Sequence, residues 1–69
     1  MRTFSCFITD GRYAVPTLDL LVVADEQRAQ ELAVRRLMES PYHQAVEVVE
    51  DGRKIYAGRR EPSDLRLHA

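Results

Sequence analysis

The residues whose types could support catalysis or metal binding lie far apart along the sequence. The histidines are His43 and His68, and the single cysteine is Cys6. General acid-base catalysis needs titratable groups that converge in a cleft with shifted pKa values. A structural zinc site needs paired cysteines or histidines at short spacings. We therefore expect no catalytic residue, no metal site and no cofactor, and we do not expect an enzyme.

The other polar candidates have structural explanations. Cys6 alternates with Phe4 on an apolar face, and a buried free cysteine behaves as a small hydrophobe. Asp10 and Asp51 each precede a glycine, which is typical of a turn. Asp19, inside an extended run, is expected to face solvent or a partner. The glycines are not clustered between a strand and a helix, as a phosphate-binding loop requires.

Basic residues gather in the C-terminal third of the chain, with Tyr56 among them. Basic side chains beside an aromatic ring on a sheet are typical of single-strand nucleic-acid binders. The formal net charge of the chain is −1, whereas nucleic-acid-binding domains normally carry a strong positive charge. An ordinary solvated hairpin is therefore the favoured interpretation. The alternative is nucleic-acid contact through Arg53, Lys54, Arg59 and Arg60.

Length and composition indicate one small globular domain. The chain has 69 residues, of which 45% are hydrophobic and 30% are charged. A domain of this size buries little core, and one cysteine cannot form an internal disulfide, so association with another subunit is the expected source of further stability. No apolar run approaches the ~20 residues of a membrane span, and no secretory signal is present. A cytoplasmic location is expected.

Hydrophobic periodicity and turn residues predict two hairpins joined by one helix. Alternating and apolar runs at both ends of the chain indicate strands, and Asp-Gly pairs indicate hairpin turns. Asp25 is the expected N-cap of the helix, which should end near Ser40-Pro41. The expected strands are Arg2–Thr9, Ala14–Val23, Gln44–Glu50 and Arg53–Ala57, and the expected helix ends at about Glu39. The predicted fold is a single α+β domain of ββαββ order over residues 1–58, with a polar C-terminal tail over residues 59–69.

One helix can cover only one face of a four-stranded sheet. The helix should bury an apolar stripe made of Ala29, Leu32, Ala33, Val34 and Leu37. The opposite sheet face is expected to keep apolar side chains, and an exposed apolar patch usually marks a contact surface. We therefore predict a homodimer, or another protein as partner, with an interface made of Phe7, Leu21, Val23, Val49 and Tyr56. In the alternative arrangement, the tail covers this face within one chain.

Part of the sequence resembles a known family. Residues Asp10 to Leu37 read Asp10-Gly11-x-Tyr13-x-Val15, then Asp19-Leu20, a short strand and an alanine-spaced helix. This pattern resembles the N-terminal half of HicB-type antitoxin domains, without their proline-glycine-cysteine segment or their Gly-Asp-Thr helix entry. The resemblance implies dimerisation and pairing with a small RNA-cleaving toxin. The whole chain is also similar to short uncharacterised bacterial ββαββ proteins.

Overall fold

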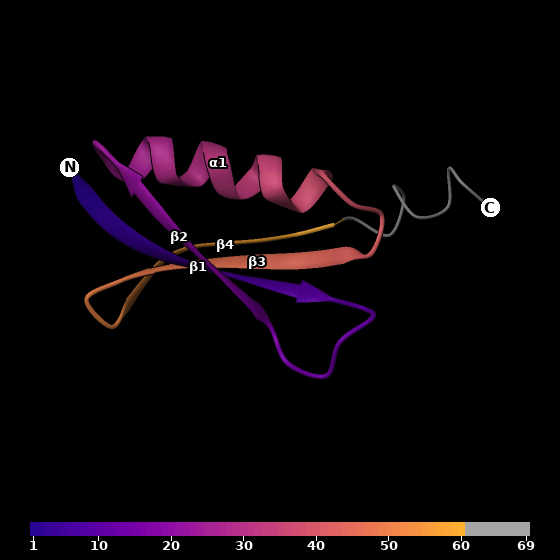
Figure 1. The fold of residues 1–69 in the computed structure, drawn as a ribbon. Helices are drawn as coiled ribbons and strands as arrows, with labels where there is room; N and C mark the ends of the chain where they lie inside the picture. The colour runs from indigo at the N-terminus through magenta and orange to yellow at the C-terminus, as the bar shows by residue number, and fades with distance from the viewer. Residues whose placement is uncertain (61–69) are drawn as a thin grey trace.

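The computed structural model describes residues 1–60, which form one sheet and one helix in ββαββ order. The elements are β1 (Arg2–Asp10), β2 (Thr17–Val23), α1 (Glu26–Met38), β3 (His43–Glu50) and β4 (Arg53–Arg59). The four strands pair antiparallel in the order β2-β1-β3-β4. Figure 1 shows α1 lying along one side of this sheet. The predicted α+β class and ββαββ order are confirmed.

The ends of α1 follow the signals in its sequence. A carboxylate oxygen of Asp25 accepts a hydrogen bond of 2.9 Å from the backbone N–H of Arg28, which satisfies one of the free donors of the first turn. Glu26 in that turn suits the positive end of the helix dipole. The helix ends at Met38, shortly before Pro41, as expected from the residue preference ahead of proline.

The core lies between α1 and one face of the sheet. The buried helix residues are Ala29, Ala33 and Leu37, which recur every four positions and so share one face. Val34 was expected in this stripe, but it lies beside the buried face, in a hollow that Tyr56 of β4 also lines, and is 41% exposed. The buried strand residues are Phe4, Cys6, Ile8, Leu21, Val23, Val46 and Val48.

The two hairpins close differently. Asp51 and Gly52 both have positive φ, 51° and 77°, as in the two-residue turn that matches strand twist. The turn at Asp10 is longer, because β2 begins only at Thr17 and residues 11–16 form a loop. The predicted start of this strand at Ala14 was therefore wrong. Asp10 shapes the loop instead, since its backbone carbonyl accepts from the N–H of Tyr13 at 3.1 Å.

The last strand runs further than predicted. β4 includes Arg59, and the backbone N–H of Arg60 donates to the carbonyl of Gln44 at 2.9 Å. Regular pairing thus continues beyond residue 58. The rest of the predicted tail lies outside the described residues, and so does the alternative in which it covers the second sheet face.

Candidate interaction surface

The face of the sheet opposite α1 consists of alternate residues from all four strands. The pairing register arranges these residues in four rows across the sheet. Read from β2 towards β4, the rows are Val22 and Thr3; Leu20, Ser5, Val49 and Lys54; Leu18, Phe7, Glu47 and Ala57; and, starting at β1, Thr9, Ala45 and Arg59. Apolar residues occupy the β2 side of these rows, and charged residues occupy the β3 and β4 side. The face therefore has an apolar half and a charged half.

The most exposed apolar side chains of this face lie on β2. Leu18, Leu20 and Val22 are 54%, 59% and 59% exposed, and we call these three residues the apolar stripe. Phe7 and Val49 lie on the same face, as predicted, and are half-buried. Three large apolar residues exposed on one edge strand form a contiguous patch of the kind that marks contact surfaces.

Leu21 and Val23 do not belong to this surface, contrary to the prediction. Leu21 pairs with Phe4, and Val23 pairs with Arg2, so both lie on the same face as Phe4. They are 3% and 8% exposed and belong to the core. Because successive side chains alternate between faces, this register places the stripe residues outward instead.

Asp19, which was expected to face solvent or a partner, shares its face with Leu21 and Val23. In the structure, the Asp19 carboxylate lies 2.8 Å from Nε of Arg36 on α1. The charge is therefore paired on the helix side, and no polar residue marks the outward side of the strand.

Tyr56 also lies on the other face from the one predicted. The register of β4 against β3 shifts between Val48 and Val49, so that Val48 pairs with Tyr56 while Val49 pairs with Lys54. Ile55 is the extra residue of this bulge. Ile55 and Tyr56 both pack against the core. A bulge depends on how two strands meet, and the sequence of β4 gave no signal for it.

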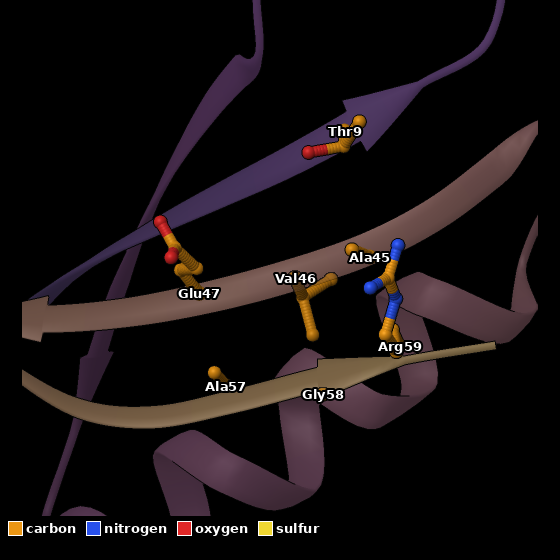
Figure 2. A pocket seen from close by; sticks show the side chains of 7 residues that line it. All are labelled: Thr9, Ala45, Val46, Glu47, Ala57, Gly58 and Arg59. Atoms are coloured by element: carbon orange, nitrogen blue, oxygen red, sulfur yellow. The ribbon is translucent and has the colours of Figure 1, made fainter.

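The charged half of the face contains an open hollow. Figure 2 shows it with α1 behind the sheet: Ala45 and Ala57 leave its floor low, while Thr9, Glu47 and Arg59 rise around it. Its volume is about 330 Å³. Glu47 pairs with Lys54 at 2.8 Å. The hollow therefore combines small apolar residues with an acid and a base at its rim.

The basic residues considered for nucleic-acid contact do not form one patch. Arg53 and Lys54 begin β4, whereas Arg59 ends it, roughly 17–20 Å away at the usual rise per strand residue. Arg60 is half-buried, and its guanidinium donates to the backbone carbonyls of Leu37, Ser40 and His43 at 2.8–3.0 Å. The positive charge is thus spread along β4, and Arg60 serves the fold.

The densest group of polar side chains lies where the β1–β2 loop meets the start of β3. Asp10 is 3% exposed, and both of its carboxylate oxygens accept hydrogen bonds from Arg12, at 3.1 and 2.8 Å. This bidentate contact lowers the pKa of Asp10 to about 2. The Arg12 guanidinium also stacks over the rings of Tyr42 and Tyr13, at 4.5 and 5.3 Å.

His43 connects this group to the helix. Its Nδ1 lies 2.6 Å from the carbonyl oxygen of Arg36, and its Nε2 lies 3.7 Å from the Asp10 carboxylate. A carbonyl oxygen only accepts, so Nδ1 donates this hydrogen bond. His43 and Asp10 therefore join the end of α1 to the β1–β2 loop. His68, the other histidine, lies outside the described residues.

Cys6 and the acidic residues lie in surroundings that favour structural roles. Cys6 is fully buried, and burial raises the pKa of its thiol. Within residues 1–60, histidine, cysteine and acidic side chains form no group of three that could hold a metal ion. The described part of the chain likewise contains no helix that is long and apolar enough to cross a membrane.

Comparison with known proteins finds no family model, no curated protein and no solved structure that matches this chain. The resemblance to HicB-type domains therefore stays a prediction.

Proposed function

We propose that this chain is a small homo-oligomeric interaction module, an accessory subunit rather than an enzyme, which associates through the apolar stripe of Leu18, Leu20 and Val22. The observation that carries this proposal is the exposure of all three side chains on one edge strand. A monomeric soluble protein seldom leaves such a patch uncovered. A chain of 69 residues also gains more from a partner subunit than a larger domain does.

The size of the stripe sets the strength of association that it can support. Burying the exposed half of one such side chain contributes roughly 1 kcal/mol. The six stripe side chains of two copies would then contribute about 6 kcal/mol before any costs. Association itself costs about 4–15 kcal/mol in lost freedom of motion. Even complete burial of the stripe gives at best a very weak dimer, so neighbouring groups must add to it.

Sedimentation velocity over about 1 µM to about 1 mM protein tests this proposal. We expect a reversible dimer in the native chain and a shift to monomer in Leu20→Lys. Val34→Lys is the matched control, because Val34 is also an exposed apolar residue but lies on α1, away from the apolar stripe. Circular dichroism checks that both variants stay folded. A native chain that is monomeric at every concentration would refute the proposal, as would equal dimerisation of Leu20→Lys.

The nucleic-acid alternative receives little support from the placement of the basic residues. Lys54 pairs with Glu47, and Arg60 binds backbone carbonyls. The chain has three tyrosines and no tryptophan, so its absorbance at 280 nm is weak and bound nucleic acid would clearly raise the absorbance at 260 nm. Recording both wavelengths in the same sedimentation experiment tests this alternative directly.

A further inference from the structure

The two edges of the sheet differ in how they meet other strands. β4 carries Arg53, Lys54 and Arg59 and is bent by the bulge at Ile55. Charges and bulges are the usual devices that keep an edge strand from pairing. β2 has no bulge, because it pairs with β1 in unbroken register, and its one charged residue, Asp19, is already paired with Arg36. Among the strands of residues 1–60, β2 is the open edge.

We propose that β2 pairs antiparallel with β2 of a second copy about a two-fold axis at Leu20, which joins two four-stranded sheets into one of eight strands. This inference rests on the proposed function and specifies how the two copies meet. The backbone N–H and C=O groups on the open side of β2 then find partners, as in strand addition at other sheet edges. They provide the contribution that the apolar stripe lacks.

The sequence of β2 is complementary to itself in this arrangement. Full overlap of the seven-residue strand places Leu20 opposite its own copy and Leu18 opposite the second copy's Val22. Thr17 then lies opposite the second copy's Val23. Directly opposed residues point to the same side of an antiparallel sheet, so the two stripes merge into one patch. Each stripe side chain gains a neighbour where its strand was open, but it buries only part of its exposed surface against that neighbour, so the paired backbone groups must supply the rest of the stabilisation.

Charge is balanced at the new contact between the two β2 strands, which we call the seam. On the helix side of β2, Asp19 and Arg36 form an ion pair at 2.8 Å. Two copies would bring two acids and two bases to the seam, with no net charge. The cationic β4 strands would lie at the far ends of the joined sheet, well separated from each other. Like charges and the bulge oppose pairing between two β4 edges, so the assembly closes as a dimer.

The length of the seam predicts a reversible dimer. Seven residues at the usual rise span roughly 23 Å, and we expect an edge of this length to bury less than the ~1,200 Å² at the lower limit of stable interfaces. Dimer formation should therefore depend on protein concentration.

Distances between two nitroxide labels, measured by double electron–electron resonance, distinguish edge pairing from stacking of two sheet faces. Ala57, exposed on β4, would be replaced by cysteine and labelled with a nitroxide, while the buried Cys6 stays unlabelled. Edge pairing separates the two β4 strands by seven strand spacings, roughly 34 Å. Stacked faces lie ~10 Å apart and would bring the labels within about 20 Å where the two β4 strands overlie each other. We expect the longer distance.

Disulfide formation tests the register. Leu20→Cys should cross-link to its own copy under mild oxidation, because directly opposed residues lie within disulfide range. Val22→Cys should cross-link at least about 10-fold more slowly, since its own copy lies four residues along the seam, roughly 13 Å away. Equal rates for the two variants would overturn the register at Leu20.

The outcomes separate this inference from the proposed function. A dimer with labels within about 20 Å would overturn edge pairing and leave self-association intact. A native chain that is monomeric at every concentration would overturn both, and would assign the open edge to a strand from another protein or to no partner. The longer distance together with selective cross-linking at Leu20 supports the paired β2 strands.

Discussion

Arg60 is predicted to hold the end of the helix against the sheet, and Arg60→Ala tests this role. Its guanidinium donates to the carbonyl oxygens of Leu37 and Ser40 at the end of α1, and to that of His43 at the start of β3. The backbone N–H of Arg60 pairs with Gln44 and does not depend on the side chain. The substitution should therefore remove the side-chain contacts and keep the strand pairing.

The expected loss follows from the number and setting of these hydrogen bonds. A hydrogen bond from a charged donor contributes ~1.5–3 kcal/mol when buried, but Arg60 is only half-buried, so water will partly replace it. We expect a total loss of about 2–3 kcal/mol. Domains of this size have a free energy of unfolding of roughly 3–10 kcal/mol, and the loss should lower Tm by about 10–20 °C.

Urea and thermal unfolding followed by circular dichroism measure this loss. Arg59→Ala is the matched control, because Arg59 is the exposed neighbour and its removal should cost less than ~0.5 kcal/mol. Arg60→Lys should recover only part of the loss, since an ammonium group lacks the planar fork that reaches several carbonyls. If Arg60→Ala unfolds at the same urea concentration as Arg59→Ala, the side chain does not hold the end of α1.

Three further predictions follow from single residues. Gly52→Ala should cost about 1 kcal/mol in urea unfolding, because Gly52 has φ of 77° and an L side chain disfavours that region; an unchanged midpoint would contradict this turn geometry. Asp10 has a folded-state pKa of about 2 against 3.8 for the free group, so its contribution to stability is complete above pH 3.8 and is lost as the pH falls towards 2. The free energy of unfolding should therefore fall less steeply with decreasing pH in Asp10→Asn than in the native chain. Equal slopes for the two proteins would be inconsistent with the Arg12 contact. The buried Cys6 thiol, with its raised pKa, should react with a thiol reagent only after denaturation, and rapid labelling of the native chain would show that Cys6 is accessible.

The features that could be predicted from sequence are those set by neighbouring residues. Asp25 marks the start of the helix because its carboxylate caps the first turn, and Asp51-Gly52 marks a tight turn because both residues tolerate positive φ. Alternation in β1 correctly places Phe4 and Cys6 in the core. Each signal acts within a few residues, so the ββαββ order could be read directly.

The features that were predicted wrongly or missed depend on contacts between distant segments of the chain. The apolar run of β2 has no alternation, so its outward face is decided only by pairing with β1, which buries Leu21 and exposes Leu20. Tyr56 changes face because of a bulge. The role of Arg60 depends on carbonyls 17–23 positions earlier in the chain, and no local pattern marks such a contact.

The sheet order also constrains how this chain folds. β1 is made before the other three strands of this sheet, yet it lies in the middle, between β2 and β3. Its pairs with β3, such as Ser5 with Val49, join residues from opposite ends of the described chain, and closing so long a loop is slow. Until β3 arrives, the β1–β2 hairpin has an unpaired edge and lacks the Val46 and Val48 side of its core. Folding should therefore be a single late event, completed only after nearly the whole domain has been synthesised.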